Sequence, residues 1–519
     1  MTLVCVPLPV HALDEIPSLL ARASRVAERG AEIIEWRIDP LLTESSVDAA
    51  LHEETLDALA QLIRDCVLPS LVTARSVAEG GQCALAPDDL FALLGEIGSL
   101  QFPPRFIDVE LAIIERLGRV PCVRSGGASL LYSAHDMQGP PSSLARIYQR
   151  MVEDDRCAVA KIAYRARSVR DCHDAFELLA LRAKPSILLC MGEEGLATRV
   201  LARKFGAFLT FASEGDGLES APGQPTIDLL KRQYRCSAIN RATEVFGVLG
   251  FPVAHSQSPA FHNARFAECA RDAVYLPLPV RSDWESFKAT LTMLLDDVAL
   301  SFRGASVTIP HKEHLVRFVQ ERGGEVDTTT AWIGAANTLV VRSDGSLFAT
   351  NTDLPAACSV LADAFAAPLR GKRIAVFGAG GVARAIAGGL AEEGARVSII
   401  NRTHERAAQL AKELSSAGRG VVTAMREDAI ACNPTGCERF DCFVNATPVG
   451  MTGGPDPDGF ILPDSAPLDT DTVVFDTVYA PRETPLLRLA RARGARCVDG
   501  MTMFTRQAEL QSKLWLECR

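Results

Sequence analysis

The stretch Arg373-Ile374-Ala375-Val376-Phe377-Gly378-Ala379-Gly380-Gly381-Val382-Ala383-Arg384 decides the fold of the C-terminal half. An apolar run leads into a G-x-G-x-x-A turn, helical spacing follows over 383–393, and a second apolar run covers Arg396–Ile400. Gly378 and Gly380 permit a tight turn and a close approach of the backbone to a ligand, and the N-terminus of a helix attracts phosphate. The pattern therefore predicts a strand–turn–helix unit of a parallel sheet that binds a dinucleotide, although such a turn also occurs without a nucleotide.

The residues after the second apolar run indicate which dinucleotide is expected. They read Asn401-Arg402-Thr403, with no acidic residue. Sites for NAD usually place Asp or Glu here, on the ribose 2′-hydroxyl, whereas a nearby arginine accommodates the 2′-phosphate of NADP. The residues favour NADP, and the alternative is an arginine that only faces solvent.

The N-terminal half contains eight short apolar runs, and the segments between them, such as 12–29 and 144–153, have apolar residues at helical spacing. Continuous apolar strands that alternate with helices indicate a parallel sheet covered by helices. Eight such units predict a closed (β/α)8 barrel, with an open doubly wound sheet as the alternative. The runs are Leu3–Leu8, Ile33–Asp39, Leu68–Arg75, Phe106–Leu111, Leu130–Asp136, Ala158–Arg165, Ile187–Gly192 and Phe208–Ser213.

Charged residues gather at the C-terminal ends of these runs, where barrel enzymes place their catalytic groups. Lys161 lies within Ala-Val-Ala-Lys-Ile-Ala, so strand alternation directs it into the barrel. Burial disfavours an ammonium ion, and a neutral amine attacks a ketone to form a Schiff base. Alternatively, its stem lies along apolar surface while its head reaches water. His135 is a candidate proton shuttle. Further charged residues at these ends are Glu35, Arg37, Asp39, Arg75, Asp108, Glu110 and Asp136.

From Val4 to about Leu230, these motifs resemble type I 3-dehydroquinate dehydratase. The motifs are Glu35–Asp39, Thr73–Arg75 with Glu79, Asp108–Glu110, Ser133–Asp136, Lys161–Ala163, Met191-Gly192 with Thr198-Arg199, and Ser220–Gln224. The resemblance implies that Lys161 forms an imine with the C3 ketone, so that the carbanion left at C2 delocalises onto the iminium nitrogen. His135 then moves the C2 proton and assists loss of the C1 hydroxyl, and Glu79 orients His135.

The same resemblance implies the rest of the dehydratase pocket. Arg199 binds the substrate carboxylate with two parallel hydrogen bonds. The other residues implied are Glu35, Arg37, Arg75, Ser220 and Gln224, which grip hydroxyls or shape the pocket, with Met191 and Phe211 as apolar walls.

Polar motifs flank the glycine-rich turn in the second half, and in their order they resemble shikimate dehydrogenase from Phe246 to about Trp515. They are His255–Pro259, Ser306–Lys312, Gly334–Thr338, Asn351–Asp353, Asn445–Met451, Val478–Pro481 and Gly500–Phe504 with Gln507. The resemblance implies that Lys312 and Asp353 form the catalytic pair at the carbonyl. Ser256 and Ser258, with Tyr479, then bind the carboxylate, and Thr308, Asn337 and Gln507 bind ring hydroxyls.

The dehydrogenase resemblance also implies the cofactor residues and shows three departures. Ala349 and Ala356 stand where the family usually has glycine, near a hinge at Asp353, and Pro448 replaces a common serine in a cofactor loop. None of the three removes a reacting group. The cofactor residues implied are Gly378, Ala379, Gly380, Gly381, Val382, Ala383, Asn401, Arg402, Thr403, Thr447 and Gly500.

Composition narrows the class of protein. The chain has 519 residues with a net charge of −10, which argues against binding to nucleic acid or an anionic membrane. No apolar run reaches the about 18 residues of a membrane span. Fifteen scattered cysteines disfavour disulfides and zinc, so no metal is expected. The start of the chain lacks a basic flank, and a cytoplasmic location is expected.

The two resemblances together predict a barrel over 1–230, a linker over 231–243, a substrate-binding domain over 244–360 completed by 485–519, and a Rossmann NADP-binding domain over 361–484. They imply consecutive reactions: 3-dehydroquinate is dehydrated to 3-dehydroshikimate, which is then reduced to shikimate with NADPH. Two alternatives remain open, namely a second half that acts on quinate and an inactive fusion that serves as a scaffold. Because Lys161, His135, Lys312 and Asp353 are all present, the sequence argues against a scaffold.

Overall fold

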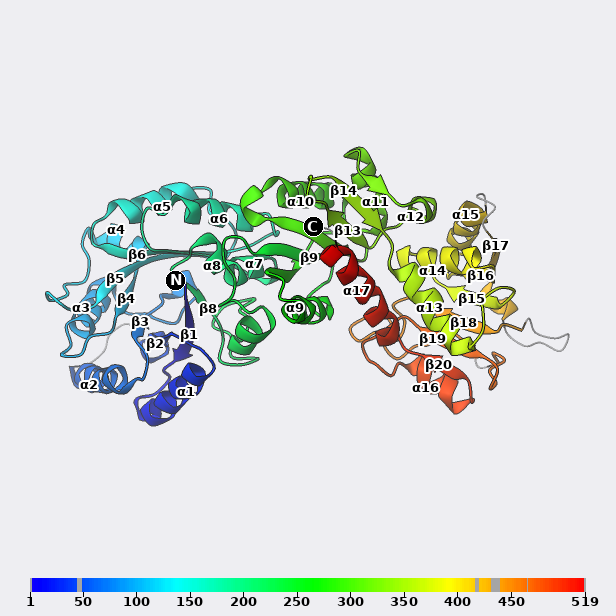
Figure 1. Ribbon diagram of the computed structural model, residues 1–519. Coiled ribbons are helices and arrows are strands. Elements are labelled where there is room, and N and C mark those ends of the chain that lie inside the picture. Colours follow the sequence, from blue (N-terminus) through cyan, green and yellow to red (C-terminus); the bar gives the residue numbers. More distant parts are fainter. Residues whose placement is uncertain (1, 44–48, 416–419, 431–438, 464, 518–519) are drawn as a thin grey trace. The chain divides into compact units, whose positions relative to one another are not determined.

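The computed structural model describes residues 2–43, 49–415, 420–430, 439–463 and 465–517 (Figure 1). The chain falls into two units. The first contains Met1–Val245, Ala254–Val280 and Met293–Ser301, and the second contains Phe246–Val253, Arg281–Thr292 and Phe302–Arg519. The finer division into domains remains a prediction.

The first unit contains an eight-stranded parallel sheet in the order β7-β6-β5-β4-β3-β2-β1-β8. All eight predicted strands are confirmed, and the amide of Phe208 donates to the carbonyl oxygen of Ser186 at 2.8 Å, which links the two ends of the sheet. Because sequential strands are neighbours without a reversal, the sheet is a barrel rather than a doubly wound sheet. The strands are β1 (Leu3–Pro9), β2 (Ile33–Arg37), β3 (Ser70–Thr73), β4 (Phe106–Glu110), β5 (Ser129–Asp136), β6 (Cys157–Arg165), β7 (Ser186–Met191) and β8 (Leu209–Phe211).

Helices connect these strands in turn, as the apolar spacing predicted. The predicted helix over 144–153 is observed with the same bounds, while that over 12–29 consists of a short 3₁₀ turn and a helix from Ile16. The helices are α1 (Ile16–Glu28), α2 (Ala49–Asp65), α3 (Pro87–Gly98), α4 (Leu111–Leu117), α5 (Leu144–Glu153), α6 (Asp171–Leu181), α7 (Leu196–Val200) and α8 (Ala202–Phe205). The first unit also contains α9 (Ser258–Glu268) and β10 (Ala273–Pro279).

The inward-facing side chains of the barrel form an apolar layer and a charged layer. Successive side chains of a strand alternate between faces, so inward residues are two apart. On β6, Val159 belongs to the apolar cluster and Lys161 follows it on the same face; on β4, Phe106 is followed in the same way by Asp108. Ser133 of β5 pairs in register with Lys161. The charged layer thus lies toward the C-terminal ends of the strands.

The second unit contains two sheets. Five of its strands follow one another in the order β9-β11-β13-β14-β12, in which β11, β13 and β14 are antiparallel. Their bounds are β9 (Glu244–Gly250), β11 (Phe302–Val307), β12 (Glu325–Val326), β13 (Thr338–Val341) and β14 (Leu347–Thr350). The helices around this part of the chain are α10 (Trp284–Asp296), α11 (Lys312–Glu321), α12 (Thr328–Ile333) and α13 (Asp353–Phe365).

The other sheet is parallel and has the order β17-β16-β15-β18-β19-β20, which is the Rossmann order. The glycine-rich stretch that begins at Arg373 forms β15 (Arg373–Phe377), the turn, and the start of α14 (Gly381–Glu392). The predicted second strand is β16 (Arg396–Ile400). The helix begins two residues before the predicted start because Gly380 is already its N-cap. The remaining elements are α15 (His404–Ser415), β17 (Val421–Met425), β18 (Cys442–Asn445), β19 (Val473–Asp476), α16 (Pro485–Ala492), β20 (Arg496–Val498) and α17 (Gly500–Glu517).

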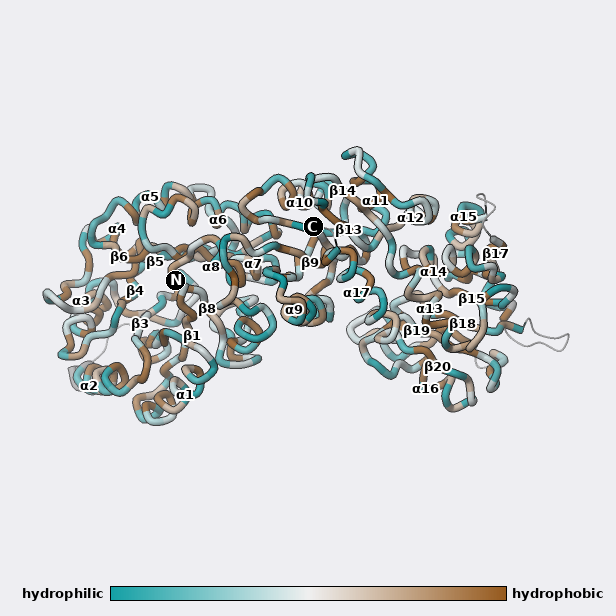
Figure 2. The backbone as a smooth tube through the Cα atoms, viewed as in Figure 1, coloured by the Kyte–Doolittle hydropathy of each residue, from teal (hydrophilic) through white to brown (hydrophobic). Residues whose placement is uncertain are grey.

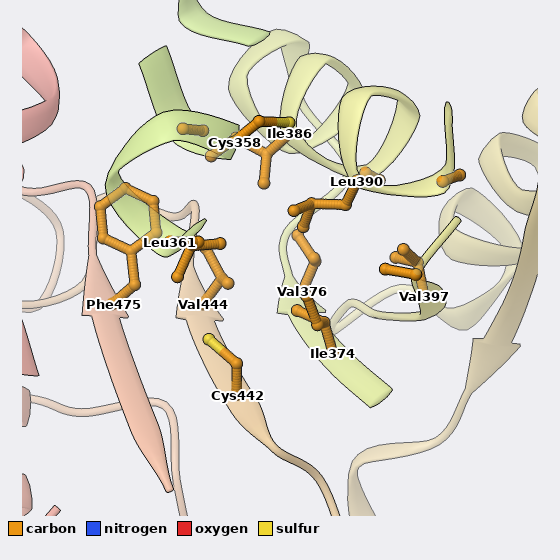
Figure 3. Close-up of a cluster of buried hydrophobic side chains, with 14 of the residues drawn as sticks. Cys358, Leu361, Ile374, Val376, Ile386, Leu390, Val397, Cys442, Val444 and Phe475 are labelled. Atoms are coloured by element: carbon orange, nitrogen blue, oxygen red, sulfur yellow. The ribbon is translucent and has the colours of Figure 1, made fainter. Parts of the chain in front are cut away.

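The core of this sheet holds the glycine-rich turn in place. In Figure 2 hydrophobic residues line β18 and β19. Figure 3 shows side chains of the sheet, such as Val376, Val444 and Phe475, directed toward Leu361 of α13 and Leu390 of α14. Burying apolar side chains of this size stabilises by about 1.5–3 kcal/mol each. The packing fixes β15 and α14, and with them the turn that connects them.

Candidate active sites

Lys161 lies in the middle of β6, inside the barrel, with 4% of the residue exposed. Its Nζ donates to Oδ2 of Asp108 at 3.0 Å and lies 3.5 Å from Oε1 of Glu35. The ring centroid of Phe211 is 4.8 Å from the same nitrogen. Two carboxylates therefore lie beside the amine, because inward side chains of β2 and β4 reach the same level of the barrel.

Glu79 and His135 form a hydrogen-bonded pair at the same end of the barrel. Oε2 of Glu79 lies 2.8 Å from Nδ1 of His135. Glu79 ends a short 3₁₀ turn in which its amide donates to Oγ of Ser76. A Cβ at Gly81 would lie 2.2 Å from the carbonyl oxygen of Arg75, so only glycine lets the turn close here. The turn holds the carboxyl group toward His135, as the resemblance implied.

Burial and nearby charges set the protonation of this pair. Burial raises the pKa of Glu79 to about 8, although the charge of Arg75 opposes the shift. Burial also lowers the pKa of His135 well below its usual value, and the charges of Arg75 and Lys161 add to this. Both shifts favour the uncharged form of the group concerned, and the two groups titrate as a pair.

Arg75 connects the acidic residues of the barrel. Its Nη2 donates to Oδ2 of Asp108 at 2.8 Å, and its Nη1 lies 3.0 Å from Oε1 of Glu110 and 3.1 Å from Oε2 of Glu79. Nη1 also donates to Oγ of Ser133 at 2.8 Å. Because these donors are used within the protein, Arg75 shapes the pocket through its neighbours.

Arg199, on α7, is 2% exposed and suits an anionic ligand. Among the described residues no side chain pairs with its guanidinium, and its buried Nε has no hydrogen-bond partner. Burial lowers the pKa of this arginine to about 10. A buried cation without a partner is costly, and a carboxylate bound through two hydrogen bonds removes that cost.

Three other predicted pocket residues have defined partners. The amide and Oγ of Ser220 donate to Oε1 of Gln224 at 2.8 and 3.0 Å, which leaves the buried Nε2 of Gln224 without a partner among the described residues. Arg37 donates from Nε and Nη2 to the two carboxylate oxygens of Asp39. Met191 is buried at the end of β7.

In the second unit, Lys312 begins α11 and Asp353 begins α13. Both residues are buried, and Nζ of Lys312 lies 2.5 Å from Oδ2 of Asp353. The amide of Asp353 donates to Oδ1 of Asn351, whose Nδ2 donates to the carbonyl oxygen of Ala335. A cation and a carboxylate are thus fixed side by side at two helix starts.

A buried polar network lies in the same unit. Nδ2 of Asn337 donates to Oγ1 of Thr352 at 3.1 Å, and Oε1 of Gln507 lies 3.4 Å from the same nitrogen. Gln511, one turn after Gln507 on α17, donates to the carbonyl oxygen of Asn337. Thr308 follows β11, half-buried. The structure therefore brings Asn337 and Gln507 together, as predicted.

The glycine-rich turn has one open side and one closed side. Gly378 has φ = +116°, and a Cβ there would lie 2.8 Å from the carbonyl oxygen of Ala446. A Cβ at Gly380 would have no described atom within 4 Å, whereas one at Gly381 would lie 3.1 Å from Cδ of Lys312. The open side leaves room for a pyrophosphate at the start of α14, and the closed side packs on the lysine.

The residues predicted to hold the rest of the cofactor lie at the same edge of the sheet. Asn401 directly follows β16, and its Nδ2 donates to the carbonyl oxygen of Thr403. Arg402 is exposed, and no described residue forms a hydrogen bond or ion pair with its side chain. Thr447 follows β18 and donates from Oγ1 to Oδ1 of Asn445. Ala379, Val382 and Ala383 belong to the turn and the first turn of α14, and Gly500 begins α17.

The residues predicted to bind the carboxylate of the dehydrogenase substrate belong to different parts of the chain. Ser256 and Ser258 lie in the first unit, where the amide of Ser258, at the start of α9, donates to Oγ of Ser256 at 3.3 Å. Tyr479 is in the second unit, half-buried, with its ring centroid 5.5 Å from that of Phe504. Their role remains a prediction.

The three departures lie in ordered segments. Ala349 of β14 pairs in register with Leu339 of β13. In α13, the amide of Ala356 donates to the carbonyl oxygen of Thr352, the N-cap residue of the helix. Both alanines are fully buried, so the segments around Asp353 are a regular strand and a regular helix. Pro448 accepts a hydrogen bond from the amide of Met451 through its carbonyl oxygen.

Sequence reasoning noted Asp108 and Glu110 at a strand end but gave them no role. Thr352 was part of the motif Asn351–Asp353 but had no role of its own, and Gln511 was missed. The available signals were the alternation that places Asp108 and Glu110 on the same face of β4, and the four-residue spacing from Gln507 to Gln511 on one helix.

Three family models match consecutive parts of the chain up to residue 428. The model described as type I 3-dehydroquinase matches residues 4–241, that of the shikimate dehydrogenase substrate binding domain matches 248–339, and that of shikimate / quinate 5-dehydrogenase matches 360–428.

Three relatives illustrate the similarity. A chloroplastic bifunctional 3-dehydroquinate dehydratase/shikimate dehydrogenase of Arabidopsis thaliana is 33% identical over 99% of this chain and 82% of its own length. A shikimate dehydrogenase (NADP(+)) of Methanocella arvoryzae is 40% identical over 52% of this chain and 92% of its own. The structure of shikimate 5-dehydrogenase from Thermus thermophilus, with NADP(H) and shikimate, is 33% identical over 52% of this chain and 93% of that one, with a TM-score of 0.43.

The fold and the two sites define a chain that joins a lysine-centred barrel to a nucleotide-binding oxidoreductase. The chain belongs to the family of bifunctional 3-dehydroquinate dehydratase/shikimate dehydrogenases. It is therefore an enzyme with a lyase part and an oxidoreductase part, as predicted. Among the described residues, no helix is long and apolar enough to cross a membrane.

Proposed function

We propose that this chain dehydrates 3-dehydroquinate to 3-dehydroshikimate at the barrel site and reduces 3-dehydroshikimate to shikimate with NADPH at the second site. The observation that carries the proposal is the buried Lys161 with the Glu79–His135 pair and the unpartnered Arg199 in one barrel. An amine, a proton shuttle and an anion-binding guanidinium are the groups that dehydration of a keto acid through an imine requires. The test is an absorbance assay of NADPH consumption that starts from 3-dehydroquinate.

In the dehydratase site, the residues divide the steps of the reaction among them. The neutral Nζ of Lys161 attacks the C3 ketone, and the former carbonyl oxygen takes up one proton and leaves as water as the iminium forms. Nε2 of His135 takes the C2 proton, and the imine accepts the electron pair; His135 then returns a proton to the leaving C1 hydroxyl. Glu79 orients the ring through Nδ1 at 2.8 Å. Arg199 binds the substrate carboxylate, and Gln224 offers its free Nε2 to a hydroxyl.

The pH dependence of dehydration should reflect the Glu79–His135 pair. His135 acts as a base from Nε2 when Nδ1–H donates to a Glu79 carboxylate, which requires that the pair has lost its last proton. Because the pKa of Glu79 is raised to about 8, kcat/KM for dehydration should rise with pH and level off above about 8. Glu79→Gln, which cannot ionise, should remove this rise. A wild-type profile that is already flat above pH 6 would contradict the assignment.

In the dehydrogenase site, Lys312 donates a proton to the carbonyl oxygen as that oxygen gains negative charge, and Asp353 holds the lysine in place. Asn337, Thr308 and Gln507 bind ring hydroxyls. Ser256, Ser258 and Tyr479 are proposed for the substrate carboxylate. When bound, NADPH supplies the hydride.

The residues of the glycine-rich turn fit that cofactor. Gly380 leaves open space at the start of α14 for a pyrophosphate, and Gly378 adopts a backbone conformation that suits glycine. Asn401 directly follows β16, at the position where an acidic side chain would repel a 2′-phosphate. The exposed Arg402 is the next residue.

Arg402→Ala should weaken NADPH binding by roughly 10- to 150-fold and change NADH binding little. The estimate follows from the about 1.5–3 kcal/mol of a hydrogen bond to a charged group, at about 1.4 kcal/mol per tenfold. Arg402→Lys should recover part of the loss, because an ammonium keeps the charge without the two-pronged geometry. Dissociation constants for both cofactors at fixed ionic strength provide the measurement. Equal losses for NADPH and NADH would show that Arg402 supports the fold or the adenine instead.

Quinate remains the second candidate substrate for the dehydrogenase part, since one matching family model covers both acids. Steady-state oxidation of shikimate and quinate with each nicotinamide cofactor decides between them, and we expect shikimate with NADP to have the higher kcat/KM. A scaffold without activity would give no signal in any of these assays. The free cysteines, such as Cys66 and Cys122, favour a reducing compartment, and we place the enzyme in the cytoplasm on that basis.

A further inference from the structure

A buried carboxylate of β4 forms a hydrogen bond with the reacting amine, and the proposed mechanism gives this carboxylate no task. Asp108 lies on β4 and is 3% exposed. Its Oδ2 accepts hydrogen bonds from Nζ of Lys161 at 3.0 Å and from Nη2 of Arg75 at 2.8 Å. Its Oδ1 accepts from Oγ of Ser133 at 2.5 Å. Both oxygens are thus fixed, and one of them faces the amine.

The surroundings keep this carboxylate negatively charged. Burial alone would raise its pKa, but the charges of Arg75 and Lys161 hold the pKa of Asp108 well below its usual value. Glu35 is a weaker partner for the amine, at 3.5 Å, and its Oε1 also accepts a hydrogen bond from Thr73. Asp108 is therefore the nearest fixed anion at every stage in which Nζ has a positive charge.

We propose that Asp108 is a positioning residue for the dehydratase, acting through Lys161: it holds Nζ in place and stabilises the positive charge of the iminium. This proposal rests on the imine at Lys161 proposed above. The neutral amine, the ketone and one proton give the iminium and one molecule of water, so a positive charge develops on a buried nitrogen. A fixed anion at 3.0 Å lowers the free energy of that charge without moving.

Glu110 provides the matched comparison. It lies two residues from Asp108 on the same face of β4, it is buried to a similar degree, and it also accepts a hydrogen bond from Arg75. Its second oxygen accepts from Ser76 and not from Lys161. Loss of either charge disturbs Arg75, but only loss of the Asp108 charge removes the partner of the amine.

The test measures imine formation directly. The full-length protein is incubated with 3-dehydroshikimate, without NADPH, and the iminium is reduced with sodium cyanoborohydride at a series of pH values. Intact mass gives the trapped fraction, and peptide mapping gives its position. Charged and titratable groups around the amine are Cys5, Glu35, Arg75, Glu79, Asp108 and His135.

Asp108→Asn should lower the equilibrium constant for iminium formation, counted from the neutral amine and a proton, by roughly 10- to 150-fold. It should also move the midpoint of the pH profile of trapping to lower pH by about one unit or more, because the ammonium loses an anionic partner. Glu110→Gln should leave that midpoint at the wild-type value. Asp108→Glu, which keeps the charge, should restore the midpoint even if turnover remains low.

The outcomes separate this inference from the proposed function. No adduct on Lys161 in the wild type would overturn the imine itself. An adduct on Lys161 with the same midpoint in wild type and Asp108→Asn would overturn the role of Asp108, as would equal shifts in Asp108→Asn and Glu110→Gln. If Asp108→Asn does not fold, Asp108→Glu decides: a midpoint shifted to lower pH despite the retained charge also contradicts the proposal.

Discussion

Lys161→Ala should lower dehydration of 3-dehydroquinate by at least about 10⁴-fold, a loss typical of removing a nucleophile. Without the amine no imine forms, and the carbanion at C2 has no electron-accepting nitrogen. Reduction of 3-dehydroshikimate should continue nearly unchanged, because Lys312, Asp353 and the glycine-rich turn lie in the second unit with its own hydrophobic core. The measurement is kcat of each half-reaction on the same protein sample.

Lys161→Arg is the matched control for charge. A guanidinium keeps a cation beside Asp108 and Glu35 but does not form an imine with a ketone. The arginine variant should therefore be as inactive in dehydration as the alanine variant. Its free energy of unfolding should lie closer to that of the wild type than the free energy of unfolding of the alanine variant does. Hydride trapping during turnover of the wild type should modify the peptide that contains Lys161. An adduct on another buried lysine of the barrel, such as Lys204, would overturn the assignment.

Lys312→Met should lower kcat for reduction of 3-dehydroshikimate by roughly 10²- to 10³-fold, which corresponds to about 2.7–4 kcal/mol of lost transition-state stabilisation. The carbonyl oxygen gains charge as the hydride arrives and needs the proton that Nζ supplies. Methionine retains the alkyl part of the side chain, which packs at Gly381, so NADPH should still bind. Stopped-flow single turnovers and a cofactor titration measure the two quantities separately.

Lys288→Met provides the control for loss of a lysine in the same unit, because Lys288 is exposed and pairs with Glu321 on the surface. Its kcat should stay within about twofold of the wild type, as surface ion pairs contribute about 1 kcal/mol or less to stability. If Lys312→Met kept most of its kcat, Lys312 would not be the proton donor, and Asp353 would have to be tested in that role.

The strands and the two families were readable from the sequence because the relevant signals are local. Eight apolar runs of strand length and the glycine-rich turn each lie within about ten consecutive residues, and alternation alone directed Lys161 inward. The pairing of Glu79 with His135 came only with the family resemblance, since the two are 56 positions apart in the sequence.

The surroundings of Lys161 could not be read in the same way. Whether Asp108 or Asp39 reaches the amine depends on strand register and on side-chain direction across the barrel. The sequence shows that both are acidic residues near strand ends, but not that Asp39 pairs with Arg37 while Asp108 faces Lys161. The same holds for Arg199, whose lack of a partner is a property of the packed structure.

The contact between Gly381 and Lys312 limits how the cofactor preference of this enzyme can change. Any side chain at residue 381 would press on the stem of Lys312, the proposed proton donor, because its Cβ would lie 3.1 Å from Cδ of the lysine. A substitution in this part of the glycine run would therefore alter turnover together with cofactor affinity. Asn401, Arg402 and Thr403 have no such contact with the lysine in the described structure, and Arg402 is exposed. Substitutions that change the cofactor preference from NADP to NAD should therefore lie at residues 401–403 and leave Gly381 unchanged.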